Sequence, residues 1–367
     1  MIKAIPFYTK LAHITICLLG IGYLVIIGKT ILAPLILALL FAMLLIPFAN
    51  LLERKLHFSR GLACFLVLLV LVGVISGIMV LLGSQLTAFA QDIPAFENQV
   101  MEALESLQAW IAKSFNIDNS KQAEYINNTT ADALGTGTAI IGVTLMSLSS
   151  SLLFTVFIFL YTFFLLMHRS LLLRFLLALF HENHSPVVLE AVGRIQYIIR
   201  KYILGLLLQM AIVAALSCIA FTVLGIKYAF LLGMLTGILN VIPYVGIFIS
   251  MLLSILVTFA TATPNDILFV AIALSCIHLI DSNYIMPKIV GSKVKLNTLV
   301  AVIGLVVGEL VWGITGMFLS IPIIAIAKVI FDRVEGLKPW GMVLGEDETL
   351  AQAQKDVPAE EELPPIE

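Results

Sequence analysis

Long runs of apolar residues follow one another along most of the chain, separated by short polar segments. The first three extend over Leu11–Gly28, Ile31–Ala49 and Gly61–Gly83. A helix that crosses the hydrocarbon core of a bilayer needs about 20 apolar residues, and each run is close to that length. Polar residues do not alternate with apolar ones inside the runs, which favours helices over a β-barrel. The pattern predicts an all-α polytopic membrane protein.

Three later runs complete a set of six full spans. They are Ile140–Met167, Tyr202–Leu224 and Ile267–Ile280, and an amphipathic helix is expected over Val187–Arg200, between the first two. The segment from Glu53 to Arg60 is basic, and short basic loops remain in the cytoplasm. This rule orients the spans with the amino terminus inside the cell.

Two further apolar stretches, Ala229–Ala260 and Thr298–Ile330, are too long for one straight span. Helix-interrupting residues occur within both of them, namely Pro243 and Gly246 in the first and Gly313, Gly316 and Pro322 in the second. Proline removes a helical N–H group and glycine has a low helix propensity. Such breaks are tolerated at membrane depth where protein or a water-filled cavity covers the freed backbone groups.

The broken stretches allow two topologies. If each is a re-entrant hairpin, the loop with Lys288, Lys293 and Lys295 faces the cytoplasm, as the positive-inside rule requires. If each were a single span, this loop would lie outside. We therefore expect six full spans plus two re-entrant hairpins, with both termini cytoplasmic, and eight spans are the alternative. Paired interrupted segments are also typical of inverted-repeat transporters.

Composition supports a lipid environment and adds a charge asymmetry. Hydrophobic residues make up 60% of the chain and charged residues only 12%, whereas soluble domains have about 25% charged residues. Acidic residues concentrate in residues 85–137 and in the tail from Glu346. The expected segments are 1–84 (three spans), 85–137 (an acidic extramembrane module), 138–201 (a span and a basic cytoplasmic connector), 202–340 (a transporter core) and 341–367 (an acidic disordered tail).

Motifs for catalysis are not found in the sequence. There is no HExxH, nucleophile elbow, P-loop or dinucleotide fingerprint. The four cysteines lie in apolar runs without a CxxC pair, which indicates small buried hydrophobic residues rather than a metal site. We therefore expect no enzyme activity, no cofactor, no metal centre and no nucleic-acid partner.

Glu309 is the sharpest candidate for a functional residue. It lies in an apolar run from Leu299 to Trp312, and no basic residue follows before Lys328. A carboxylate within the membrane is costly and is by default a functional hypothesis. Glu309 could exchange a proton or ligate a cation such as Na⁺. The alternative is a protonated structural glutamate that is hydrogen-bonded to the broken backbone.

Further polar residues lie next to the breaks. His278 and Asp281 share a helix face at a spacing of three, and Asn283 follows them. They could form a proton-accepting pair, or mark the aqueous boundary where Asp281 caps a turn. Asn240 could bond backbone carbonyls freed by the break at Pro243 or bind a ligand. Gln209 is a weaker candidate.

The segment Asp281–Gly291 (DSNYIMPKIVG), followed by Gly304, Gly308, Glu309, Gly313, Gly316 and Pro322, resembles the most characteristic stretch of the AI-2E (autoinducer-2 exporter) family. The break from Ile242 to Gly246 is similar to that family's proline–glycine break, and the layout of spans agrees as well. One departure is that Asn297-Thr298 stands where the family usually has His-Pro.

The resemblance implies a secondary transporter of a bacterial inner membrane. Family members have been linked to autoinducer-2 export and to Na⁺/H⁺ antiport, and a homo-pentamer is the implied assembly. The expected function is therefore export of a small polar solute with ion or proton coupling. The alternatives are a monovalent cation/proton antiporter and a non-transporting membrane scaffold.

The re-entrant topology predicts opposite sidedness for two loops. Single cysteines at Ser292 and Gln108, in a background without the native four, should react with a membrane-impermeant thiol reagent from opposite sides of the membrane. Gln108→Cys should react in intact cells and Ser292→Cys only after permeabilisation. Reaction of both in intact cells would contradict this topology.

Overall fold

The computed structural model describes residues 7–91, 153–242, 245–261, 264–289 and 296–345, almost all of them in helices. Within these ranges the extended backbone pairs only at an isolated bridge between Leu296 and Gly345. The predicted all-α architecture is confirmed. Pro243, Lys293, Lys295, the tail from Glu346 and the acidic segment beyond Gln91 lie outside the described residues.

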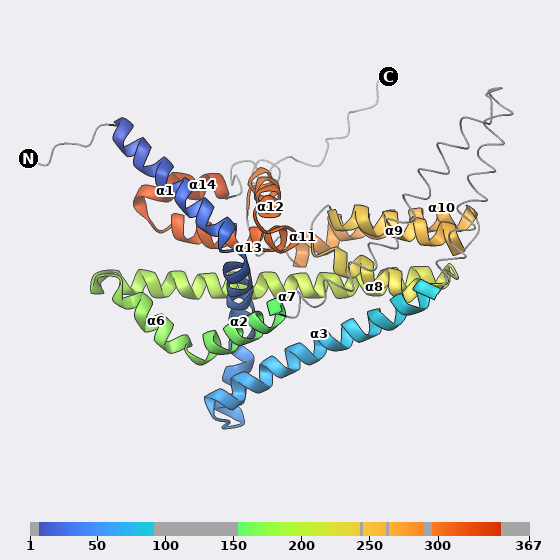
Figure 1. The fold of residues 1–367 in the computed structure, drawn as a ribbon, viewed down its shortest axis with the longest axis horizontal. Helices are drawn as coiled ribbons and strands as arrows, with labels where there is room; N and C mark the ends of the chain where they lie inside the picture. Colours follow the sequence, from blue (N-terminus) through green and yellow to red (C-terminus); the bar gives the residue numbers. More distant parts are fainter. Residues whose placement is uncertain (1–6, 92–152, 243–244, 262–263, 290–295, 346–367) are drawn as a thin grey trace, which may run out of the picture. The chain divides into compact units, whose positions relative to one another are not determined.

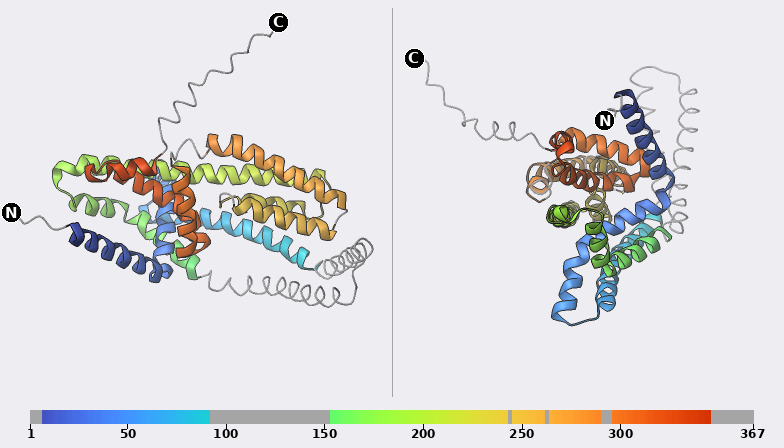
Figure 2. Two further views of the ribbon diagram at one scale, coloured as in Figure 1. Left: turned by 90° about the horizontal axis from the view of Figure 1, so that it is seen from above. Right: turned by 90° about the vertical axis from the view of Figure 1, so that its left-hand side faces the viewer.

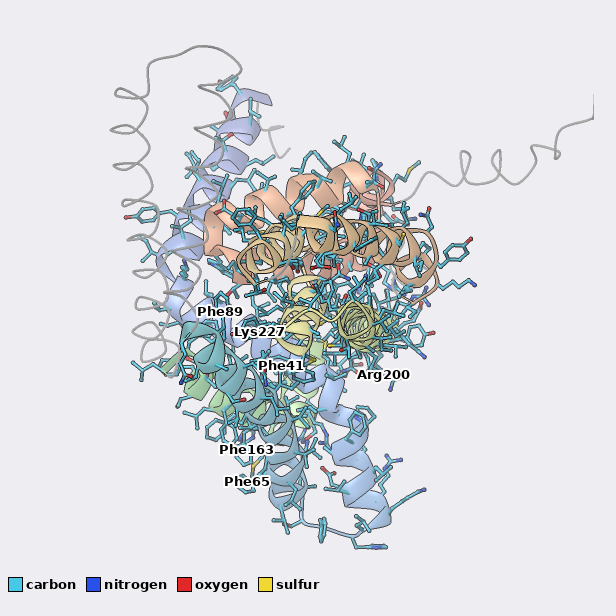
Figure 3. All side chains as sticks on the ribbon, turned by 90° about the vertical axis from the view of Figure 1, so that its right-hand side faces the viewer. Phe41, Phe65, Phe89, Phe163, Arg200 and Lys227 are labelled. Atoms are coloured by element: carbon cyan, nitrogen blue, oxygen red, sulfur yellow. The ribbon has the colours of Figure 1, made fainter. Side chains whose placement is uncertain are left out.

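Several described helices are long and apolar enough to cross a membrane. Five qualify individually, and a sixth is obtained if Leu153–Met167 and α6 (Arg169–Ala178), which meet at 69°, form one span. Large apolar side chains project outward from them, as Figure 3 shows. Leu69, Val80 and Val223 are examples, with 51%, 72% and 81% of their surface exposed. Such surfaces require lipid or another protein chain as cover.

The chain forms two compact units, each assembled from separate stretches of sequence. The first contains residues 1–47, 164–205 and 287–367, and the second contains residues 48–163 and 206–286. Helices α2 (Lys29–Lys55) and α7 (Ser185–Val223), which are labelled in Figure 1, contribute residues to both units, as does the helix Leu153–Met167. The five consecutive segments predicted from the sequence describe which parts of the chain lie in lipid and which in water. The two compact units do not test that division, so it stays a prediction.

The first unit contains the carboxy-terminal hairpin. Its helices, besides parts of α2 and α7, are α1 (Phe7–Ile27), α6, α11 (Met286–Ile289), α12 (Thr298–Trp312), α13 (Ile314–Phe331) and α14 (Lys338–Leu344), with short 3₁₀ turns at Glu182–His184 and Glu335–Leu337. Asn297 caps α12 by accepting a hydrogen bond from the Leu299 N–H at 2.9 Å. Asn297-Thr298, which differs from the His-Pro expected from the resemblance, therefore still begins a helix.

Gly313 separates α12 from α13 and lets them fold back on each other. Its φ of 64° is a conformation that other residues rarely adopt, and its N–H donates to the Glu309 carbonyl at 2.7 Å. Gly308 and Gly316 then cross so closely that a Cβ on either would overlap the other's carbonyl group. The second predicted break is thus confirmed at Gly313. Gly316 and Pro322, which the sequence grouped with it, lie inside α13.

The second unit is a bundle around one apolar core. Its helices, besides parts of α2, α7 and the helix Leu153–Met167, are α3 (Arg60–Gln91), α8 (Ala229–Leu239), α9 (Val245–Thr261), α10 (Pro264–Ile280) and the π-helical turn η2 (Asp281–Ile285). They can be followed from cyan to orange in Figures 1 and 2. Phe221, Leu232, Val270 and Leu274 fill the core with almost no exposed surface.

Glycines set the approach of α8 to its neighbours. A Cβ on Gly237 would meet the Met210 carbonyl and Ala214, and one on Gly233 would meet Cys218. This small-xxx-small spacing lets two membrane helices pack with their backbones in contact. The first predicted break is confirmed as well, because α8 ends at Leu239 and α9 begins at Val245. A Cβ on Gly246 would overlap the Leu239 carbonyl.

Helix α7 differs from the prediction. An amphipathic helix over Val187–Arg200 and a span over Tyr202–Leu224 were expected as separate elements, whereas α7 is continuous over 39 residues. No proline or turn sequence interrupts the chain between Arg200 and Tyr202. Helix formation is cooperative, so a helix continues from a polar segment into an apolar one where no helix-breaking residue occurs. The connector and the membrane helix are therefore one rod.

The Gly308–Gly316 crossing predicts unequal effects of two glycine-to-alanine changes. Gly316→Ala should destabilise the protein by roughly 1–3 kcal/mol, because the new methyl group overpacks the crossing of α12 and α13. Gly77→Ala is the matched control, since no atom lies within 4 Å of its added Cβ. Thermal unfolding in detergent measures both. Equal midpoints for the two variants would contradict the close crossing.

Candidate functional site

A buried carboxylate lies where four helices of the second unit meet. Asp281 follows the last residue of α10, and only 6% of its surface is exposed. Gln209 of α7, which is 5% exposed, and Asn240, which follows α8, both point toward it. These three polar side chains come from sequence positions separated by 41 and 72 residues, so only the folded bundle brings them together.

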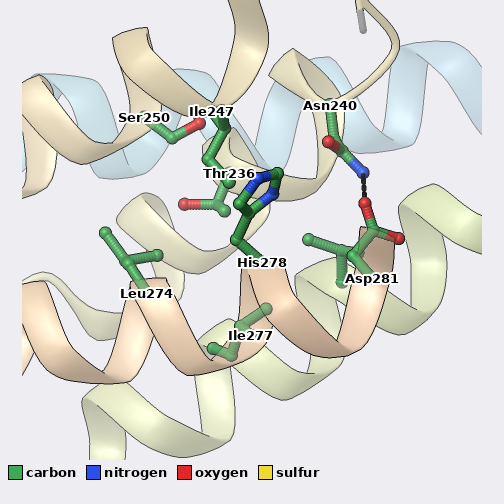
Figure 4. A pocket seen from close by; sticks show the side chains of 9 residues that line it. Thr236, Asn240, Ile247, Ser250, Leu274, Ile277, His278 and Asp281 are labelled. Carbon is green, nitrogen blue, oxygen red and sulfur yellow. Dashed lines mark hydrogen bonds between the residues drawn. The ribbon is translucent and has the colours of Figure 1, made fainter. Parts of the chain in front are cut away.

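Both oxygens of Asp281 accept hydrogen bonds from amide groups. The Gln209 Nε2 donates to Oδ1 at 2.9 Å and to Oδ2 at 3.0 Å. The Asn240 Nδ2 donates to Oδ2 at 3.0 Å, the bond drawn in Figure 4. Neither donor carries a charge. Among the described residues, no lysine or arginine forms an ion pair with Asp281.

Irregular backbone positions two of the three residues. Asn240 caps the carboxyl end of α8, where its N–H still donates to the Thr236 carbonyl. Asp281 is the first residue of the π-helical turn, whose wider winding is closed by the Met286 N–H donating to the Asp281 carbonyl. π-Helical turns inside α-helices are rare and are found frequently at functional sites. A broken helix and a widened turn therefore meet at the same carboxylate.

A narrow pocket borders the Asp281 carboxylate. Its lining residues are Val213, Thr236, Asn240, Ile247, Ser250, Leu274, Ile277, His278 and Asp281. Figure 4 shows His278 extending from α10 into the space between Thr236 and Asn240. The interior has room for about one water molecule. The pocket thus offers carboxylate, amide, hydroxyl and imidazole groups to a small polar particle.

Buried hydroxyls extend the polar lining along α9. Ser250, Ser254 and Thr258 recur every four residues and are 3%, 1% and 0% exposed. Ser250 donates to the Gly246 carbonyl and Thr258 to the Ser254 carbonyl. The Ser254 hydroxyl has no hydrogen-bond partner among the described residues. One face of α9, the helix that follows the break, therefore carries buried hydroxyl groups.

The sequence-predicted residues divide into two groups. His278 and Asp281 line the same pocket, as their spacing predicted, but no hydrogen bond between them is found in the described chain. Asp281 is buried, so it is not the solvated cap that the sequence also allowed. Asn240 bonds Asp281 rather than the freed backbone carbonyls. Asn283 is exposed, and its amide donates to the Leu279 carbonyl at 2.8 Å.

Glu309 is not part of this cluster. It belongs to the first unit, where it is exposed on α12. Its side chain makes no hydrogen bond or ion pair to another described residue. Trp312, one turn later, donates from its indole N–H to the Val25 carbonyl of α1 at 3.0 Å.

Sequence reasoning ranked Gln209 below the other candidates, although it makes two of the three contacts to Asp281. The sequence does distinguish Gln209, because it is the only amide side chain in the apolar run 202–224. Its importance depends on a partner 72 residues away, which periodicity within one helix does not reveal.

The comparison with protein families covers both the bundle and the hairpin. The model of the AI-2E family transporter matches residues 14–336. This chain belongs to the AI-2E family. The match includes Gln209, Asn240, Asp281 and Glu309, so the site described above lies within the family's shared region.

The names of similar proteins agree with this membership. TqsA of Escherichia coli (strain K12), named an AI-2 transport protein, is 25% identical over 340 residues, which are 92% of this chain and 94% of TqsA. YueF of Bacillus subtilis (strain 168), named "Putative transport protein", is 23% identical over 83% of this chain and 84% of YueF. YrrI of the same organism is 35% identical over 128 residues, about a third of each chain. An AI-2E family member with these helices is a multi-pass membrane transporter.

Proposed function

We propose that this AI-2E transporter is a secondary transporter of the bacterial inner membrane that exports a small polar solute with ion or proton coupling. The observation that carries the proposal is Asp281, a buried carboxylate held by two neutral amides without a cationic partner in the described chain. An ionisable residue of this kind within a membrane bundle is a functional hypothesis by default. Burial of an unpaired charge is costly unless a proton or cation compensates it.

The amides can satisfy Asp281 in two protonation states. As a carboxylate, Asp281 only accepts hydrogen bonds, and the NH₂ groups of Gln209 and Asn240 supply them. As a neutral acid, it must donate one hydrogen bond. Rotation of either amide by half a turn presents a carbonyl oxygen to that proton. The same two amides can therefore pair with Asp281 in either protonation state.

Monovalent cation/proton antiport is the second candidate function, and the same residues favour it. A cation in the narrow pocket could be ligated by the Asp281 carboxylate together with amide and hydroxyl oxygens of Asn240, Thr236 and Ser250. Oxygen ligands of this kind suit hard cations. The limited space favours a small ion over an organic solute in this conformation. Solute export would require the broken helices to move.

Autoinducer-2 is the solute suggested by the name of one relative. TqsA is named for AI-2 transport, and this chain covers 94% of it at 25% identity. Family membership and the proposed coupling site support export of such a solute, whereas a non-transporting scaffold would use the buried carboxylate only to hold the helices together. Direct flux measurement distinguishes the three functions.

We also propose that the protein assembles as a homo-oligomer, with the pentamer implied by the resemblance. One face of α12 carries Val302, Val306 and Leu310, with 41%, 56% and 75% of their surface exposed, around Glu309, which has no side-chain partner among the described residues. A carboxylate that faced lipid would be costly, so a protein surface should cover it. A neighbouring copy would provide that cover.

The coupling proposal predicts loss of flux in Asp281→Asn. Asparagine retains the shape and hydrogen-bonding capacity of the neutral acid but cannot ionise, so coupled movement should fall to background. Inverted vesicles with a pH-sensitive dye measure cation-driven proton movement, and vesicles loaded with autoinducer-2 measure solute flux. Asp266→Asn, in the first turn of the same helix α10, is the matched control and should keep wild-type rates.

Glu309→Gln separates the two carboxylates in the same assays. If Asp281 couples transport, the Gln variant should keep the pH profile of the wild type between pH 5 and 9. Wild-type flux in Asp281→Asn together with loss in Glu309→Gln would transfer coupling to Glu309. Absence of both fluxes in the well-folded wild-type protein would favour the scaffold.

The assembly proposal predicts crosslinking through α12. Val306→Cys, in a background without the native cysteines, should be crosslinked between neighbouring copies in membranes by a long, flexible bis-maleimide, because equivalent residues in a ring need not touch. Val80→Cys, which is also on an exposed apolar face, is the control and should crosslink less. A monomeric mass by light scattering, together with no crosslinking of Val306→Cys, would contradict the assembly.

A further inference from the structure

A cluster of basic residues lies on α7 directly before its apolar part. Arg194, Arg200 and Lys201 occur within eight residues of one another, and the buried residue Tyr202 follows them. The segment belongs to the 42-residue candidate span Glu182–Val223, which is longer than a bilayer requires. Its basic amino-terminal part therefore extends out of the hydrocarbon region at the level of lipid headgroups. Figure 3 labels Arg200 on this helix.

Two of these cations gather around one aromatic ring. The Arg194 guanidinium carbon lies 6.0 Å from the centroid of the Tyr197 ring, and the Lys201 Nζ lies 5.9 Å from it. The spacings of three and four residues place all three side chains on one helix face. Tyr197 is 44% exposed, so this face is accessible in the first unit. We call Arg194, Tyr197 and Lys201 the basic clamp.

No acidic side chain in the described chain neutralises the basic clamp. The nearest acid in α7 is Glu190, and its carboxylate already accepts a hydrogen bond from Arg333 at 2.7 Å. Among the described residues, Arg194 and Lys201 form no ion pair. Two like charges held beside one ring repel each other, and an anion between them would relieve that repulsion.

The composition of α6, the helix before α7, indicates that the anion belongs to a lipid headgroup. α6 bends by 69° from the apolar helix Leu153–Met167. It exposes Leu171, Leu172 and Phe175 and carries Arg169 and Arg174. Exposed apolar side chains beside arginines are typical of a helix that lies in the membrane interface. A tyrosine beside lysine and arginine at a span end is typical of the same depth.

We propose that the basic clamp binds the phosphate of an anionic phospholipid headgroup. Arg194 and Lys201 would bracket the phosphate, and Tyr197 holds the two cations apart through its ring. The apolar side chains that follow Tyr202 on α7 would contact the acyl chains of the same lipid. Clusters of basic residues next to a span are a known means of recognising anionic lipids. This site is separate from the Asp281 cluster and does not depend on the transport proposal.

Lipid titration of the purified full-length protein tests the clamp. Native mass spectrometry should show preferential binding of phosphatidylglycerol over phosphatidylcholine. Each neutralised cation should weaken phosphatidylglycerol binding about fivefold, so Arg194→Gln/Lys201→Gln should lose roughly 25-fold. Arg54→Gln/Lys55→Gln, at the end of α2, removes the same charge elsewhere and is the matched control. It should change the affinity less than fivefold.

Variants of the ring distinguish a clamp from diffuse attraction. Tyr197→Phe keeps the aromatic face and should bind like the wild type, whereas Tyr197→Leu should lose most of the preference. Equal weakening by both double variants, with no effect of Tyr197→Leu, would overturn the proposal. Displacement of the lipid by inorganic phosphate at equal concentration would also overturn it, because the site would then select free phosphate. Unchanged thermal unfolding of each variant ensures that these comparisons report binding.

Discussion

The need to satisfy a carboxylate inside an apolar bundle determines how the second unit is built. Asp281 accepts three hydrogen bonds from Gln209 and Asn240 within a unit whose neighbouring core is filled by Phe221, Val270 and Leu274. Only 6% of the Asp281 surface is exposed, so its oxygens depend mainly on donors from the protein. α7 must present Gln209 at that level, α8 must end at Asn240, and the chain must widen into a π-helical turn at Asp281.

Glycines make these placements possible. Gly233 and Gly237 let α8 approach α7 closely, and Gly246 allows α9 to begin beside the end of α8. The first unit uses the same device, where Gly313 turns the chain and Gly308 packs on Gly316. In lipid, close backbone packing contributes more to helix association than burial of large apolar groups, because the acyl chains are equally apolar. The α8–α9 and α12–α13 hairpins therefore depend on glycines, which have no side chain, as much as on the larger residues that pack around them.

The hydrogen-bond donors around Asp281 are neutral amides, and this affects which protonation states the carboxyl group can adopt. A lysine or arginine in their place would fix the carboxylate in its ionised form, since separating a buried ion pair is costly. Amides impose no such preference, because each has a donor and an acceptor side. The chain belongs to a transporter family, and the amide-held carboxylate is the observation on which the proposed coupling rests. The basic clamp on α7 concerns a different boundary, that between the protein and anionic lipid.

The sequence by itself determined the all-α membrane class, the apolar spans, the two interrupted stretches and the family. Apolar run length and helix-breaking residues are local properties, so Pro243, Gly246 and Gly313 could be located without a fold. Only the tertiary structure showed that Gln209 and Asn240 meet at Asp281, that Glu309 belongs to the other compact unit, and that α13 continues through Pro322. Contacts across 41 and 72 residues depend on which helix faces pack together. Local periodicity cannot specify that choice when almost every face of these helices is apolar.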